Sequence, residues 1–154
     1  MSLSQLLKPD AVLAALRVNG KKQALQEMSE RAALVSGLTA REIFDAILQR
    51  ERLGSTGVGD GVAIPHGKIA KCKSIFGVFA RLDRPIDFEA PDGLPVDLIF
   101  LLIAPEAAGA DHLKALATAA RLLRNGAVAA QLRGARDPAT LYALLTMAPT
   151  SNAA

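Results

Sequence analysis

The chain has 154 residues, 51% of them hydrophobic, and a formal net charge of +3. This length favours one domain with a sizeable core, and no apolar run reaches the roughly 18 residues typical of a membrane span. With no tryptophan, one tyrosine and modest charge, the chain lacks the stacking surface or recognition motif that nucleic-acid binding needs. The single cysteine, Cys72, excludes an internal disulfide, and the N-terminus lacks a signal-peptide pattern. We therefore expect a cytoplasmic protein without membrane insertion.

The N-terminal part of the chain is predicted to hold one strand and two helices. Residues 12–18 are apolar and strand-like, although the alanines among them weaken the pattern. Apolar residues then recur at helical spacing and predict a helix over residues 20–36. Thr39 with Glu42 three residues later has the pattern of a capping box. A second helix is therefore expected over residues 39–53, ending beside a glycine-rich loop.

The C-terminal part is predicted to hold two strands followed by three helices, over residues 75–82, 96–104, 111–125, 127–133 and 138–147. Residues 96–104 are almost all apolar, which is typical of a central strand covered on both faces. The pair Arg84-Pro85 is expected to end the preceding strand. Alternation of helices and strands predicts a single α/β domain over residues 1–147, with helices on both faces of one sheet. Residues 148–154 are expected to form a disordered tail.

Residues 51–67 read Glu-Arg-Leu-Gly-Ser-Thr-Gly-Val-Gly-Asp-Gly-Val-Ala-Ile-Pro-His-Gly and are the candidate functional segment. Residues 62–64 are predicted to form a short buried strand. Pro65 has no backbone N–H, so the strand should stop there and leave the His66 imidazole at its end. Glycines allow backbone amides to approach an anion, and a neutral imidazole near such donors is suited to hold a phosphoryl group. A structural histidine in a turn is the alternative interpretation.

His112 and Arg52 are the candidates to act with His66. His112 follows Asp111 at a predicted helix start, where the helix dipole disfavours the charged imidazolium. It could equally be an ordinary helix-start residue. Arg52 could bind phosphate oxygens with two parallel hydrogen bonds. The residues expected to bind the phosphate through hydroxyls or amides are Ser55, Thr56, Gly57 and Gly67. Phosphoryl transfer requires mainly positioning and charge stabilisation, which such a set can supply.

Other chemistries find less support in the spacing. A metal site could use His66, His112 and Cys72, but the chain has neither HExxH nor CxxC. The G-x-S-x-G elbow of serine hydrolases is absent, and the glycine-rich loop lacks the ending of a Walker A motif. We therefore expect no metal, no cofactor and no ATP-dependent kinase activity. A basic stretch over residues 68–84 predicts a positive rim that attracts an acidic or phosphorylated partner.

The segment from Gly54 to Lys68 resembles the active-site segment of enzyme IIA domains of the bacterial phosphotransferase system, mannitol/fructose class. The resemblance covers nearly the whole chain and is greatest to the stand-alone nitrogen-regulatory branch. It implies a mixed sheet with helices on both sides, and a phosphocarrier. It also implies that His66 accepts a phosphoryl group from a phosphohistidine on a small HPr-like carrier, with His112 and Arg52 beside it. We expect His66 at the floor of a shallow, largely polar depression.

Three functions are compatible with this resemblance. The first is a regulator whose phosphorylation state controls partner proteins, with kinases or transporters as candidate targets. The second is a sugar-specific enzyme IIA that relays phosphate to an enzyme IIB. The third is a binding module in which the histidine is never phosphorylated. No enzyme IIB, enzyme IIC or HPr-like segment is attached, which favours the regulator. In either phosphorylated case the activity is a protein-to-protein relay rather than small-molecule catalysis.

Overall fold

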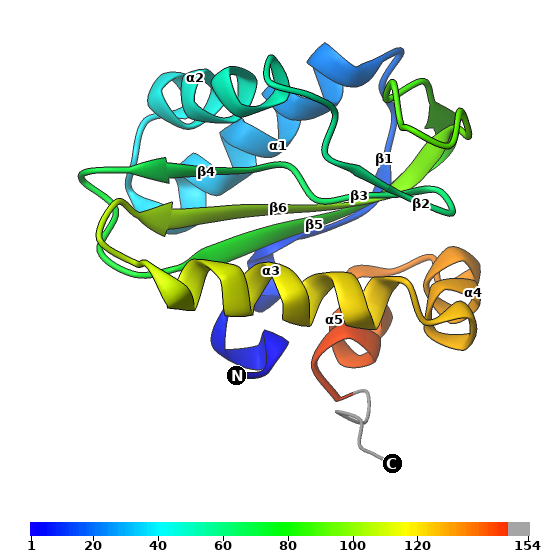
Figure 1. Cartoon of the computed structure of the whole chain (residues 1–154). Helices are drawn as coiled ribbons and strands as arrows, with labels where there is room; N and C mark the ends of the chain where they lie inside the picture. Colours follow the sequence, from blue (N-terminus) through cyan, green and yellow to red (C-terminus); the bar gives the residue numbers. More distant parts are fainter. Residues whose placement is uncertain (148–154) are drawn as a thin grey trace.

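Helices cover both faces of one mixed sheet, as the order of predicted elements indicated (Figure 1). A computed structural model describes residues 1–147, so the tail expected at 148–154 lies outside the described residues. The strands are β1 (Val12–Leu16), β2 (Gly57–Gly59), β3 (Val62–Ala63), β4 (His66–Ile69), β5 (Phe76–Ile86) and β6 (Val96–Pro105). The helices are α1 (Lys21–Ser36), α2 (Ala40–Glu51), α3 (Ala110–Leu123), α4 (Gly126–Gly134) and α5 (Pro138–Met147), and two short 3-10 turns, Leu3–Gln5 and Pro9–Ala11, precede β1.

Strand β6 is the centre of the sheet. It pairs antiparallel with β5 on one side and parallel with β3 and β4 on the other. Residues 98–104 are all fully buried, because this strand lies in the middle of a sheet that has helices on both faces (Figure 1). The prediction of a central strand over residues 96–104 is therefore confirmed. The order β1-β5-β6-β3-β2 leaves β1 at one edge and the β2–β4 region at the other.

Strands β3 and β4 lie one after the other along the same side of β6, separated by Pro65. Val62 is aligned with Leu98 in β6, and His66 is aligned with Leu102. The predicted strand does stop before Pro65, but pairing with β6 resumes at His66, so His66 begins β4 as well as following the end of β3. Pro65 interrupts the pairing because it has no N–H, but its carbonyl still accepts a hydrogen bond from the Leu102 N–H at 2.9 Å.

The two helical layers differ in which strands they cover. Helices α1 and α2 pack on one face, over β5 and β4, whereas α3 and α5 pack on the other, over β6 and β1 (Figure 1). The capping box at α2 is confirmed, since the Glu42 N–H donates to Thr39 Oγ1 at 3.1 Å. Helix α3 begins earlier than predicted, because Gly109 rather than Asp111 is its N-cap. No helix within residues 1–147 is both long and apolar enough to cross a membrane.

Strand β5 continues through Pro85, so the prediction that Arg84-Pro85 ends it was wrong. Its register against β6 shifts between Arg81 and Ile86. That irregularity takes Pro85 out of the regular ladder, where its missing N–H would otherwise leave a bond unmade. The strand therefore resumes pairing at Ile86, which is aligned with Val96.

Candidate functional site

The candidate site lies at the sheet edge formed by β4, between helix α2 from one layer and helix α3 from the other. A hollow of about 630 Å³ opens there. Its lining residues are Ala46, Gln49, Arg50, Leu53, His66, Gly67, Lys68, His112, Leu113 and Leu116. The fold thus brings His66 and His112, which are 46 positions apart in the sequence, into one hollow. A larger hollow of about 710 Å³ lies beside the N-terminal turns and contains neither histidine.

The two ring nitrogens of His66 have different environments. Nδ1 lies 2.8 Å from the carbonyl oxygen of Ile64. Because a carbonyl can only accept, Nδ1 carries the hydrogen, and Nε2 keeps its lone pair. Burial lowers the pKa of His66; the hydrogen bond to Ile64 opposes this, Arg50 lowers the pKa further and Glu51 raises it. The imidazole is therefore neutral at pH 7, with a free nucleophilic nitrogen.

His112 faces His66 from the first turn of α3. The ring centroids are 5.5 Å apart and the ring planes are inclined by 70°. His112 is only 5% exposed, and its Nδ1 is buried without a hydrogen-bond partner among residues 1–147. Burial lowers the pKa of His112, and the positive charges of His66, when protonated, and Lys68 lower it further. Two neutral imidazoles therefore share the hollow, and one has an unused polar nitrogen.

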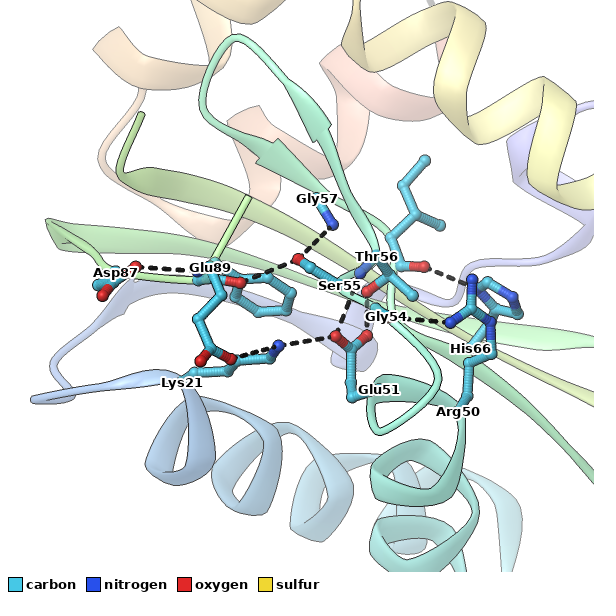
Figure 2. Close-up of polar contacts among 12 residues, drawn as sticks. Lys21, Arg50, Glu51, Gly54, Ser55, Thr56, Gly57, His66, Asp87 and Glu89 are labelled. Carbon is cyan, nitrogen blue, oxygen red and sulfur yellow. Dashed lines mark hydrogen bonds and ion pairs between the residues drawn. The ribbon is translucent and has the colours of Figure 1, made fainter. Parts of the chain in front are cut away.

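Arg50, rather than Arg52, is the arginine that the structure places in this hollow. One guanidinium nitrogen of Arg50 donates to the carbonyl oxygen of Gly54 at 2.9 Å, and Figure 2 shows this side chain beside His66. Arg52 is the C-cap of α2 and is exposed; it borders a separate hollow with Asp45 and Glu106. Side chains two positions apart on a helix point in directions about 200° apart, which accounts for the different hollows that Arg50 and Arg52 border. Sequence analysis missed Arg50, although the spacing of α2 was available to find it.

The predicted phosphate-binding residues are distributed differently from the expectation. The Ser55 hydroxyl donates to the Phe88 carbonyl at 2.9 Å, and the Thr56 hydroxyl donates to the Glu51 carboxylate, so neither is brought into the hollow. The Gly57 N–H donates to Ser55 Oγ at 3.1 Å. These contacts stabilise the loop after α2, and the residues that make them do not line the hollow (Figure 2).

Gly67 does line the hollow, and its role there is spatial. An ideal Cβ at this position would lie 3.2 Å from the Cβ and the carbonyl carbon of Ala46. The absence of a side chain therefore lets α2 approach β4 closely. The same close approach brings the last turn of α2, with Arg50, to the level of His66.

The rim of the hollow is more apolar than the depression that the sequence led us to expect. Leu53, which follows α2, is 84% exposed, and Leu113 of α3 is 69% exposed; both line the hollow with the histidines. Lys68 adds a positive charge beside them. Large exposed leucines beside a polar centre are typical of a surface that meets another protein. Within residues 1–147, no cluster of three or more His, Cys, Asp or Glu side chains could hold a metal ion.

Known proteins resemble this chain in sequence and in fold. Residues 5–148 match the family model described as "Phosphoenolpyruvate-dependent sugar phosphotransferase system, EIIA 2". A nitrogen regulatory protein from Bradyrhizobium diazoefficiens is 58% identical over 153 residues, which is 99% of this chain and 100% of that protein. A nitrogen regulatory protein from Escherichia coli is 39% identical over 147 residues, covering 95% of this chain and 90% of that protein.

The crystal structure of the nitrogen regulatory protein IIA-Ntr from Neisseria meningitidis superposes with a TM-score of 0.87 at 36% identity. That likeness covers 92% of this chain and 97% of the Neisseria chain. The mixed sheet with helices on both faces is thus shared along nearly the whole length. The chain belongs to the type-2 enzyme IIA family of the phosphoenolpyruvate-dependent phosphotransferase system, with close similarity to its nitrogen regulatory proteins.

Proposed function

We propose that this protein accepts a phosphoryl group on His66 Nε2 from a phosphohistidine on an HPr-like carrier, and regulates partner proteins according to its phosphorylation state. The observation that carries this proposal is the Nδ1 hydrogen bond to the Ile64 carbonyl. That bond holds His66 as the tautomer whose Nε2 is unprotonated. A neutral nucleophile is then available without a separate base to remove a proton.

The transfer step balances without any further reactant. The Nε2 lone pair of His66 forms a new N–P bond as the carrier's N–P bond breaks, and the carrier's imidazole nitrogen takes the leaving electron pair. The Nδ1 proton stays on His66, and the Ile64 carbonyl stabilises the positive charge that develops on the ring. Because the transition state is loose and highly charged, nearby donors contribute most of the protein's assistance.

Arg50 and His112 are the groups proposed to stabilise the phosphoryl oxygens. The Arg50 guanidinium has donors beyond the one that contacts Gly54. A neutral His112 can donate one hydrogen bond through whichever ring nitrogen carries its proton. His112 supports the transfer and is not itself the acceptor. Neither group requires a metal or an organic cofactor.

Regulation follows from the charge that phosphorylation adds. A phosphoryl group brings about two negative charges and three strong acceptor oxygens. These would appear among Arg50, Lys68 and the two exposed leucines. A partner docked on the unphosphorylated rim would have to bury that charge or dissociate. The phosphotransferase role and the unpaired thiol of Cys72 together support a cytoplasmic setting.

The test is intact mass after incubation with a phosphorylated HPr-like carrier. Wild type should gain one acid-labile phosphoryl group, and His66→Ala should gain none while retaining its fold by circular dichroism. His112→Ala should be labelled more slowly, with the phosphate still on His66. A labelled His66→Ala protein, or wild-type phosphate on His112, would contradict the assignment. A wild type that is never labelled would favour the non-phosphorylated binding module.

Relay to an enzyme IIB remains the alternative within the same chemistry. Phosphorylated protein should be mixed with enzyme IIB domains of the fructose and mannitol class. Efficient transfer to one of them would favour the sugar-specific relay. Stable phosphate, combined with a partner that distinguishes the two forms, would favour the regulator.

A further inference from the structure

A chain of polar contacts connects the start of helix α1 with the loop that follows α2. The Lys21 ammonium lies 2.9 Å from Oε1 of Glu51. The same carboxylate accepts the Thr56 N–H at 3.1 Å, and its second oxygen accepts the Thr56 hydroxyl. Figure 2 shows Lys21, Glu51 and Thr56 in this order. Both carboxylate oxygens are therefore used, although Glu51 is not in the hollow.

The same chain of contacts continues from Thr56 to the acceptor histidine. The Ile64 N–H donates to the Thr56 carbonyl at 3.0 Å. The Ile64 carbonyl then accepts the hydrogen of His66 Nδ1 at 2.8 Å. One ion pair and three hydrogen-bonded steps thus lead from Lys21 to the ring nitrogen that sets the tautomer of His66.

The contact between Lys21 and Glu51, at the end of the chain farthest from His66, is well buried, and its polar groups have hydrogen-bond or ion-pair partners. The Glu51 side chain is 3% exposed and the Lys21 side chain 16% exposed. A carboxylate buried to this degree needs a counter-charge and hydrogen bonds, and Lys21 and Thr56 supply them. The Lys21 ammonium also lies 4.6 Å from the centroid of the Phe88 ring, which restricts its position further. Its other carboxylate partner, Glu89, is 76% exposed and lies farther away, at 3.3 Å.

We infer that Lys21, Glu51 and Thr56 are positioning residues for phosphoryl transfer: they fix the Thr56 and Ile64 backbone so that the His66 ring presents Nε2 to the hollow. This inference rests on the proposed function. None of the three touches the reacting atoms. At Thr56 and at Ile64 the contacts enter through the N–H and leave through the carbonyl of the same residue. They therefore pass through a Cα atom rather than along one conjugated amide, so the chain transmits position and not electron density.

Glu51 also acts on His66 through space, and its surroundings define the sign of that effect. The charged and titratable groups around His66 are Arg50 and Glu51 from α2, Lys68 from β4 and His112 from α3. Among them Glu51 is the group that raises the pKa of His66, whereas Arg50 lowers it. Loss of the Glu51 charge should therefore shift the titration of His66 to lower pH. This shift would follow from the lost charge alone, so the tautomer of His66 and the transfer rate are the measurements that test positioning.

The decisive comparison is Glu51→Gln against Glu89→Gln. Each change removes one carboxylate partner of Lys21, but only the first interrupts the contacts that lead to His66. Nitrogen-15 NMR of the unphosphorylated protein measures the tautomer and the pKa of His66. Labelling by the phosphorylated carrier measures the rate of phosphoryl transfer. In Glu51→Gln we expect a lower pKa, a smaller fraction of the Nδ1–H form and roughly tenfold slower transfer. Glu89→Gln should match wild type in all three.

Substitutions at Thr56 provide a second, milder test. Thr56→Val keeps the shape and the backbone N–H but removes the hydroxyl that donates to Glu51, whereas Thr56→Ser keeps the hydroxyl. The valine variant should lose part of the Nδ1–H population and transfer more slowly, and the serine variant should restore both. If Glu51→Gln does not fold, the comparison of Thr56→Val with Thr56→Ser tests the inference in its place.

Three results would overturn the inference. The first is a folded Glu51→Gln protein with wild-type tautomer and rate. The second is an equal effect of Glu89→Gln on tautomer and rate, and the third is valine and serine variants at Thr56 that behave alike. Failure of the proposed function is distinct: wild type would then not be labelled at all, while the NMR measurements would still decide whether these residues position His66.

Discussion

At the residue scale, the role proposed for His66 depends on what each of its ring nitrogens faces. Ile64 fixes one nitrogen as a donor and leaves the other as a nucleophile. Long-range proton–nitrogen NMR correlations should therefore show the Nδ1–H tautomer of His66 at neutral pH, and phosphorus–nitrogen coupling should place the phosphate on Nε2. A predominant Nε2–H tautomer in the free protein would contradict this assignment.

Arg50 and Arg52 offer a matched pair for testing which arginine stabilises the phosphoryl group. Arg50 lines the hollow, whereas Arg52 lies two positions on and borders a different one. Arg50→Ala should slow phosphorylation of His66 by roughly a hundredfold, the cost of losing one preorganised donor to a developing charge. Arg50→Lys should recover part of the rate, because it keeps the charge but loses the two-pronged geometry.

The control in this experiment is Arg52→Ala, measured with the same carrier over a range of concentrations. It should leave the limiting rate near that of wild type. Its effect, if any, should appear in the carrier concentration needed for half the maximal rate, because Arg52 is an exposed cation near the site. A larger loss of limiting rate in Arg52→Ala than in Arg50→Ala would restore the sequence-based assignment.

At the scale of elements, the contact between β5 and β6 depends on a glycine. An ideal Cβ at Gly77 would lie 2.7 Å from Cζ of Phe100, which is fully buried in β6. Gly77→Ala should therefore destabilise the fold by about 1–3 kcal/mol, as overpacking does. Urea unfolding would measure this. Gly134→Ala at the end of α4, where a Cβ meets nothing within 4 Å, should be neutral or slightly stabilising.

The elements show clearly what the sequence could and could not predict. Apolar periodicity placed α1, α2, β6 and the helical C-terminal region, because each buries one continuous pattern of side chains. The passage of β5 through Pro85 was missed, because its tolerance depends on a register shift against a neighbouring strand. A local pattern contains no information about the partner's register.

The candidate site, like the helices and strands, could be predicted only in part from the sequence. A short motif identified His66, and helix-start chemistry with the family resemblance identified His112; the structure brings the two rings together. The sequence and the family resemblance pointed to Arg52, whereas the arginine that the fold brings into the hollow is Arg50. The hydroxyls of Ser55 and Thr56 were assigned to the site because their acceptors, Phe88 and Glu51, could be found only in three dimensions.

For the whole molecule, the half-buried imidazole of His66 and the buried imidazole of His112 make stability depend on pH. Burial lowers the pKa of both His66 and His112 from 6.5, so the unfolded chain binds protons more readily as the pH falls below that value. The free energy of unfolding should therefore decrease between about pH 7.5 and about pH 5.5. Urea unfolding at both values would measure it. His112→Gln, which cannot titrate, should reduce this dependence; an unchanged dependence would contradict the prediction.

Phosphorylation should change the surface of the molecule without changing its fold. The hollow is built from β4, which pairs with the central strand β6, from α3, which packs on β6, and from α2, which packs on β4. Backbone chemical shifts of the phosphorylated protein should therefore differ only around the hollow, while at least one partner binds the two forms with different affinity. Calorimetric titration of both forms would test this. Equal affinity for every partner would leave a phosphate relay without a switch.

The break in the sheet at Pro65 also affects how another protein can dock. β4 pairs with β6 alone and contains only four residues, His66–Ile69, with an exposed lysine among them. A long, regular free edge would invite an incoming strand to extend the sheet, a mode that favours persistent complexes and fibrous aggregation. This edge is short and broken at Pro65, which does not suit strand addition, so we expect partner proteins to contact it through side chains. Encounters of that kind can form and dissociate repeatedly, as the proposed transfer of phosphate between successive partners would require.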